Sequence, residues 1–140
     1  MDILRRNTDY ALRAMLHLAV SWRQGQGAVS ASKIAHDDDI PYKLACKLLY
    51  MLRKAKLVRS SSGPTGGFEL RKPPRQIRLI EIIGAVQGSV VLTGCLSRGH
   101  VCSRPNNCAI REKLKGLQTQ IDNYFSKTTL LDMLKLKRKK

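Results

Sequence analysis

The chain has 140 residues, 43% of them hydrophobic and 5% aromatic, which allows one compact domain with an aliphatic core and an appended element. Its 26 Lys and Arg residues against 10 Asp and Glu residues give a formal net charge of +16. Such a charge favours a polyanionic partner, namely DNA, RNA or an anionic membrane face, although a solvated basic surface is the alternative. No segment approaches the roughly 20 uninterrupted apolar residues that cross a bilayer, and the N-terminus lacks the apolar region of a signal peptide. We therefore expect a cytoplasmic protein with no membrane partner.

The first third of the chain predicts three helices. Residues 8–22 carry apolar side chains at helical spacing, with Thr8 as the expected N-cap. A short helix over 31–36, capped by Ser30, is followed by three aspartates and by a longer helix over 41–55, which begins at a proline. Two short helices joined by a turn of a few residues are the helix-turn-helix pattern.

The helix over 41–55 has two distinct faces. At 100° per residue, Leu44, Ala45, Leu48, Leu49, Met51 and Leu52 share one broad face. The opposite face holds Lys43, Cys46, Lys47, Tyr50 and Lys54. A helix that enters a DNA groove needs such basic, polar and aromatic side chains. The alternative is an ordinary amphipathic helix with solvated lysines.

A hairpin is expected next. Residues 57–60 and 68–70 read as strands, separated by a turn rich in Ser, Gly and Pro over 61–67. A hairpin placed after three helices is the wing of a winged helix. Its tip has little side-chain bulk, so its backbone N–H groups can approach phosphates. The DNA-contacting residues predicted here are Arg59, Ser60, Ser61, Gly63 and Gly66.

The C-terminal half predicts a helix over 77–86, a long helix over 109–125 and a last short helix over 128–136. The long helix carries apolar residues at steps of three or four, which suggests a partner helix and so a homodimer; packing within one subunit is the alternative. The expected fold is mainly α with a small β-hairpin wing. Residues 1–74 form the winged helix-turn-helix module, and residues 75–140 hold the connecting helix, a cysteine loop and the dimerisation helix.

Three of the four cysteines, Cys95, Cys102 and Cys108, are separated by six and five residues. In a reducing compartment such a cluster indicates metal or redox chemistry rather than disulfides. Soft thiolates select iron–sulfur clusters, zinc or copper(I). A cluster held by three cysteines and one other ligand fits best; zinc completed by His100, a thiol-only redox switch and three unrelated thiols are the alternatives. Cys46 is interpreted as incidental or as an apolar contact near DNA.

The sequence resembles the winged-helix iron–sulfur regulators of the IscR, NsrR and RirA type over nearly its whole length. The resemblance is carried by TDYALRAMLHLA near the start, SSSGPTGGFELRKPP at the wing, IRLIEIIGAVQG after it, and the cysteine loop with CAIREKL. It implies a homodimer whose long C-terminal helices cross and whose cysteine loops approach the first helix of the other subunit. It also implies that Lys43, Cys46 and Lys47 contact bases or backbone of double-stranded DNA.

The resemblance narrows the choice of a fourth cluster ligand. Some family members use a histidine three residues after the last cysteine, where this chain has Arg111. Others use an acidic residue at the start of the first helix of the partner subunit, which matches Asp9, although helix capping also explains an aspartate there. His100 is the competing candidate. The missing histidine favours a [4Fe–4S] over a [2Fe–2S] cluster.

Together these features predict a dimeric transcription regulator that binds a pseudo-palindromic operator. An iron–sulfur cluster is expected to set the affinity for this operator and to sense redox state, nitric oxide or iron. The alternative is a basic nucleic-acid-binding protein with a structural zinc or a thiol-only switch. An enzyme is not expected, because the chain has no Cys-x-x-Cys motif, no Ser/His/Asp arrangement and no phosphate-cradling glycine loop before a helix.

Overall fold

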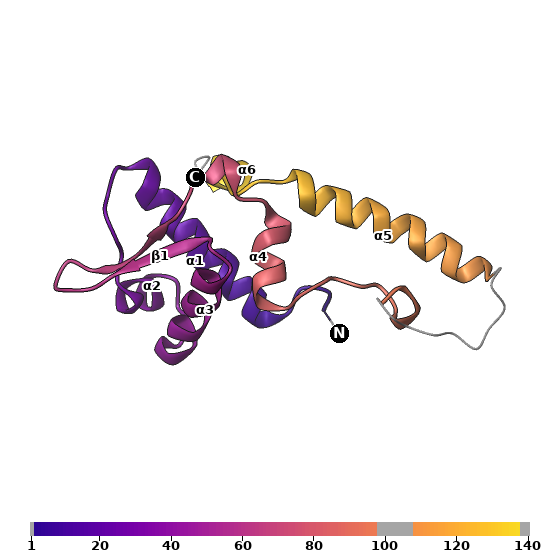
Figure 1. The fold of residues 1–140 in the computed structure, drawn as a ribbon, viewed down its shortest axis with the longest axis horizontal. Coiled ribbons are helices and arrows are strands. Elements are labelled where there is room, and N and C mark those ends of the chain that lie inside the picture. Colours follow the sequence, from indigo (N-terminus) through magenta and orange to yellow (C-terminus); the bar gives the residue numbers. More distant parts are fainter. Residues whose placement is uncertain (1, 98–107, 138–140) are drawn as a thin grey trace.

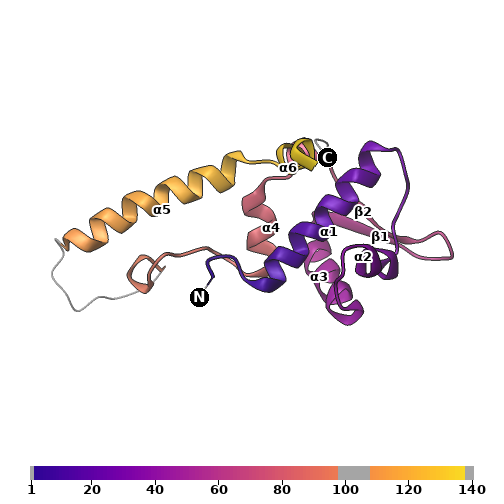
Figure 2. The same cartoon turned by 180° about the vertical axis from the view of Figure 1, so that it is seen from behind.

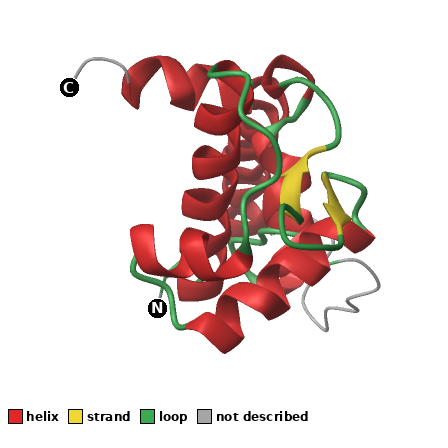
Figure 3. Ribbon diagram, turned by 90° about the vertical axis from the view of Figure 1, so that its left-hand side faces the viewer, coloured by secondary structure: helices red, strands yellow, loops and turns green. Residues whose placement is uncertain are grey.

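The computed structural model of the chain describes residues 2–97 and 108–137 (Figure 1). The α-helices are α1 (Arg6–Arg23), α2 (Ala31–Asp37), α3 (Tyr42–Lys54), α4 (Leu79–Val86), α5 (Ala109–Lys127) and α6 (Leu130–Lys137). Strands β1 (Val58–Ser61) and β2 (Gly67–Leu70) pair antiparallel, and two short 3-10 helices, η1 (Pro74–Gln76) and η2 (Gly94–Leu96), interrupt the connections. The predicted fold, mainly helical with a hairpin wing, is confirmed. Figure 3 views the molecule from the hairpin side and shows the two short strands beside the helices.

The hydrophobic core is built around α1. Met15 and Leu18 of this helix are almost fully buried, together with Leu49 of α3 and Ile82 of α4. The last helix joins the same core, since α6 lies against α1 (Figure 2) and its Leu130 is inaccessible to solvent. The beginning and the end of the chain therefore share one apolar interior.

Local sequence explains most helix starts in the winged-helix part. The Lys33 N–H donates to the Ser30 hydroxyl at 3.1 Å, which confirms the predicted cap of α2. Pro41 lies immediately before α3, where its missing N–H leaves no helix hydrogen bond unmade.

The predicted N-cap role of Thr8 is wrong. Helix α1 begins at Arg6, with Arg5 at the N-cap position, and Thr8 lies inside the helix, fully buried. Its hydroxyl donates to Oε1 of Gln87 at 2.6 Å. A tertiary contact to the end of α4 therefore takes the hydroxyl that sequence reasoning assigned to a cap.

Helix α5 differs from the others. None of its residues is buried, and Ile110, Leu117 and Tyr124 of its apolar stripe are 64%, 46% and 68% exposed. The helix extends away from the core and carries its N-terminal end far from the hairpin (Figures 1 and 2). The alternative that this stripe is buried in the core of its own subunit is therefore wrong.

Candidate nucleic-acid interface and cysteine segment

The outward face of α3 is the one that the helical phase predicts. Lys43, Lys47 and Tyr50 are exposed and Cys46 is half-buried, whereas Leu49 on the other face is completely buried. The chain thus presents two lysines, a thiol and a phenol on one side of a well-anchored helix. Contact of these side chains with DNA stays a prediction.

Arg53 is a residue of this surface that sequence reasoning missed. Its guanidinium lies 5.7 Å from the centre of the Tyr50 ring, and its Nη1 donates to the Ser60 hydroxyl at 3.1 Å. The Lys54 ammonium also lies over this ring, 5.7 Å from its centre. Arg53 therefore links α3 to β1, and its position three residues after Tyr50 was the signal that could have found it.

Tyr42 joins Cys46 at the start of α3. The pKa of the Tyr42 phenol lies above its ordinary value, first because of its hydrogen bond with the Cys46 thiol and then because of the charge of that group, while Ser32 acts in the opposite direction. Tyr42 is 55% exposed. Cys46 is thus part of the polar surface at the first turn of the helix and not of the core.

The wing is a short hairpin with a tight turn. The Gly66 N–H donates to the Gly63 carbonyl at 3.0 Å, and Gly63 has a φ of +98°, which favours glycine. A Cβ on Gly66 would collide with the Ser61 carbonyl. The turn therefore needs glycine at both positions that sequence reasoning singled out, and this keeps its backbone bare.

Charge in the wing is partly compensated. Arg59 faces Glu69 across the hairpin, and Arg59 Nε lies 2.9 Å from Glu69 Oε1. The hairpin is fixed to the rest of the module by Val29, whose N–H and C=O both bond to the backbone of Phe68, at 2.8 and 2.7 Å. The charge of Arg59 is therefore already paired with the Glu69 carboxylate. The neighbouring Ser60 and Ser61 are exposed to solvent.

Two cysteines flank the segment 98–107. Cys95 lies in η2 and Cys108 directly precedes α5; both are half-buried free thiols, and the Cys95 thiol is 3.9 Å from the Thr93 hydroxyl. Cys102 and His100 lie outside the described residues. Over residues 2–97 and 108–137, no group of three His, Cys, Asp or Glu side chains comes together at a metal-binding spacing.

Asp9 lies on an exposed part of the first turn of α1. Its carboxylate is 55% exposed and lies 2.9 Å from Nε of Arg13, one turn further along the helix. An exposed ion pair of this kind contributes about 0–1 kcal/mol, so it holds the carboxylate only weakly. Asp9 is therefore accessible to a second chain.

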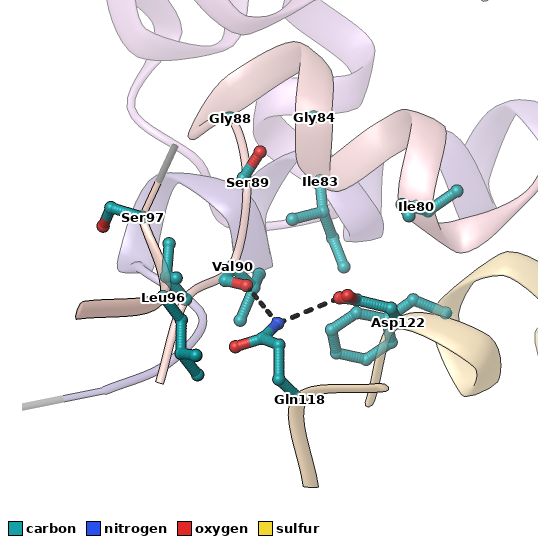
Figure 4. A pocket seen from close by; sticks show the side chains of 12 residues that line it. Ile80, Ile83, Gly84, Gly88, Ser89, Val90, Leu96, Ser97, Gln118 and Asp122 are labelled. Atoms are coloured by element: carbon teal, nitrogen blue, oxygen red, sulfur yellow. Dashed lines mark hydrogen bonds between the residues drawn. The ribbon is translucent and has the colours of Figure 1, made fainter. Parts of the chain in front are cut away.

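The segment that leads to Cys95 passes along α5. A hollow of about 560 Å³ lies between α4, this segment and α5, and is lined by Ile83, Val90, Leu96 and Phe125 among others (Figure 4). Gln118 of α5 reaches across it to the backbone of Val90. The hollow is mostly apolar and open to solvent on one side.

A helix-turn-helix with a hairpin wing, a basic outer face on the second helix and a long projecting helix define a winged-helix DNA-binding regulator. Over residues 4–136 the chain matches the Rrf2 family, described as iron-dependent transcriptional regulators. The chain belongs to this family. Its members are regulators of transcription and not enzymes.

Individual relatives agree with this assignment. A putative HTH-type transcriptional regulator of Aquifex aeolicus is 33% identical over 93% of this chain and 90% of its own length. The structure of CymR, the global cysteine regulator of B. subtilis, is similar with a TM-score of 0.82 and 26% identity, over 97% of this chain and 98% of that one. The structure of T. potens IscR has a TM-score of 0.74 and 28% identity, and the match covers 94% of this chain and 85% of that one.

None of the helices that the structure describes is both long and apolar enough to cross a membrane.

Proposed function

We propose that this protein is a homodimeric transcription regulator whose affinity for a pseudo-palindromic operator is set by an iron–sulfur cluster held by Cys95, Cys102 and Cys108. One observation carries the proposal: two half-buried free thiols, Cys95 and Cys108, stand at the two ends of the segment that contains the third cysteine. The elements that carry them, η2 and the start of α5, lie on the projecting part of the molecule, away from the hairpin (Figure 1).

The donor set fits the proposed group. Thiolate sulfur is the preferred ligand of iron–sulfur clusters, and three thiolates need one further ligand. Asp9 of the partner subunit is the leading candidate because its carboxylate is exposed and weakly paired; His100 is the competitor. Arg111, in the first turn of α5, stands where some family members have a ligating histidine, and by this resemblance its presence favours [4Fe–4S] over [2Fe–2S]. When bound, the cluster would supply a redox- and ligand-sensitive centre.

The dimer is proposed from the unburied stripe of α5. Leu117 and Tyr124 expose large apolar surfaces, and the adjoining hollow is lined by apolar side chains of α4 and α5. Burying apolar surface stabilises association by roughly 25 cal/mol per Å². A second copy of α5, related by two-fold symmetry, supplies a complementary surface, since an isologous interface uses the same patch on both subunits.

DNA recognition is assigned to α3 and the wing. Lys43, Cys46, Lys47 and Tyr50 of α3 would read or flank the major groove, and the wing residues Arg59, Ser60, Ser61, Gly63 and Gly66 would contact the backbone. Two such modules in a symmetric dimer match a pseudo-palindrome. Cluster state regulates binding if it favours one dimer geometry, with a typical coupling of about 1–3 kcal/mol.

Anaerobic purification tests the metal centre. We expect iron and acid-labile sulfide in the wild type, loss of both in Cys95→Ser, and retention in Cys46→Ser, which removes a thiol outside the cluster. Asp9→Ala and His100→Ala then identify the fourth ligand by their spectra. A colourless protein that binds one zinc per chain and no iron would overturn the proposal.

A thiol-only switch is the second candidate, and the similarity to Staphylococcus aureus CymR, whose structure is known in an oxidized form, favours it over zinc. It predicts that DNA affinity changes on oxidation of a protein that never contains iron. The same purification separates the two, because only the first candidate requires iron and sulfide for the change in affinity.

A further inference from the structure

Two glutamines lie at the two ends of the segment that leads to Cys95: the Gln118 side chain binds the segment, and the Gln87 side chain, just before it, binds the start of α1. Gln87 ends α4 immediately before Gly88, whose φ of +80° turns the chain into this segment. Gln118 lies in the middle of α5. Neither residue belongs to the DNA-binding surface or to the cysteine cluster.

Gln118 acts on the segment as a neighbouring strand would. Its Oε1 accepts from the Leu92 N–H at 2.9 Å. Its Nε2 donates to the Val90 carbonyl at 2.7 Å and to Asp122 at 3.0 Å (Figure 4). A parallel strand would satisfy the same two backbone groups on either side of Val91. The side chain thereby fixes the segment against α5, three residues before Cys95.

Gln87 makes the corresponding contacts at the other end of the segment. Its Oε1 accepts from the Arg5 N–H at 2.9 Å and from the Thr8 hydroxyl at 2.6 Å, and its Nε2 donates to the Ile3 carbonyl at 3.0 Å. All three partners lie at the start of α1, which packs directly against α3. Thr8 is fully buried, whereas the bonds of Gln87 to Arg5 and Ile3 lie at the surface.

The two glutamines therefore form a continuous connection. It runs from α5 through Gln118 to Val90 and Leu92, and from the turn at Gly88 through Gln87 to the first turn of α1. Only Ser89 and Gly88 separate the two sets of bonded residues along the chain. Displacement of the cysteine-bearing segment would have to break or move the hydrogen bonds of Gln118, and it would act on Gln87 through this two-residue link.

We propose that Gln87 and Gln118 are positioning residues that couple the segment before Cys95 to the DNA-binding module. This inference rests on the proposed function for its biological consequence, namely that cluster state changes DNA affinity through this connection. The connection itself is a property of the cluster-free chain and can be tested there.

Hydrogen exchange of the cluster-free dimer, followed amide by amide by NMR, is the first test. Gln118→Ala removes the acceptor of the Leu92 N–H, and alanine should preserve α5 because it favours helix at least as strongly as glutamine. We expect faster exchange at Leu92 and also at Arg5, whose N–H is bonded to Gln87. Gln120→Ala is the matched control, since Gln120 lies on the same helix and its side chain makes no hydrogen bond within the described residues. Faster exchange at Leu92 with unchanged exchange at Arg5 would overturn the proposal, and this result does not depend on whether the cluster controls DNA binding.

DNA binding is the second test. The ratio of operator affinities with and without the cluster should fall about 2- to 30-fold in Gln118→Ala and in Gln87→Ala, a range typical of residues on a coupling path. The affinity of the cluster-free forms should stay near that of the wild type, which a misfolded variant would not match. If the ratio is the same in both variants as in the wild type, the proposed coupling is contradicted. If the wild-type protein itself binds the operator equally well with and without the cluster, cluster control of DNA binding is contradicted, and the exchange experiment alone tests the connection between the two glutamines.

Should Gln118→Ala fail to fold, Gln118→Glu provides the second variant, because it keeps the acceptor for Leu92 and loses the donor to Val90.

Discussion

The winged-helix module and the projecting α5 are stabilised in different ways. Met15 and Leu49 in the module and Ile82 of the adjoining α4 are inaccessible to solvent, whereas α5 has no buried residue along its whole length. The module shares one hydrophobic core with α4 and α6, while α5 exposes an apolar stripe outside it. The first region is held by intramolecular packing, and under the proposed function the second is completed by contacts between subunits.

The largest expected effect lies in the core. Leu49→Ala removes a completely buried side chain from α3 and should lower the free energy of unfolding by about 2–5 kcal/mol. Tyr50→Ala, at the next position and 51% exposed, should change it by about 0.5 kcal/mol or less. Denaturant titration of both variants at one protein concentration measures this difference; equal losses would mean that the module is not anchored through this face.

The unburied stripe should control assembly. Leu117→Glu places a charge in the proposed two-fold interface of each subunit and should weaken dimerisation roughly 30-fold or more. Asn123→Glu adds the same charge to the opposite side of α5 and should leave the dimer intact. Sedimentation over a range of concentrations distinguishes them. A stable dimer of Leu117→Glu would contradict the role assigned to the stripe.

DNA affinity measured at several salt concentrations should distinguish the winged-helix module from α5. Lys47→Ala on α3 should reduce the slope of log affinity against log salt by about 1 per subunit, because one phosphate contact is lost. Lys115→Ala, an equally exposed lysine on α5, should leave the slope unchanged. Similar changes for both lysines would place the DNA surface outside the winged helix.

The smallest effect concerns Glu81 in α4. Burial acts to raise the pKa of this carboxyl, but the Arg78 N–H and the Lys72 ammonium outweigh it and lower the pKa below its ordinary value. The folded state therefore binds the proton more weakly than the unfolded state, and the stabilisation is present above the unfolded pKa and lost as the pH falls through the folded one. Glu81→Gln should cost about 1 kcal/mol near neutral pH.

The difference between Glu81→Gln and the wild type should disappear as the pH falls below the ordinary glutamate range, at about pH 4.3, and through the lowered folded pKa. Thermal unfolding across this range checks the sign. Glu112→Gln, on the exposed first turn of α5, serves as the control and should show no comparable loss. A difference that grows at low pH would contradict the assignment.

The sequence by itself determined the helical faces, the hairpin and the cysteine spacing, because these depend on residues within a few positions of one another. The phase of α3 separated Lys47 and Tyr50 from Leu49, and the glycines of the wing turn marked its tip. The apolar stripe of α5 was also visible, and its exposure was the favoured of two alternatives.

Tertiary structure alone decided the features that depend on distant residues. Thr8 was read as a cap because its partner, Gln87, is 79 residues away, and Arg53 was missed because its bond to Ser60 requires the wing to fold back onto α3. The return of α6 to the core and the bonds of Gln118 to the segment before Cys95 have the same origin. Local periodicity reports which side of an element is apolar, whereas the partner of each polar side chain is fixed only when the elements have packed.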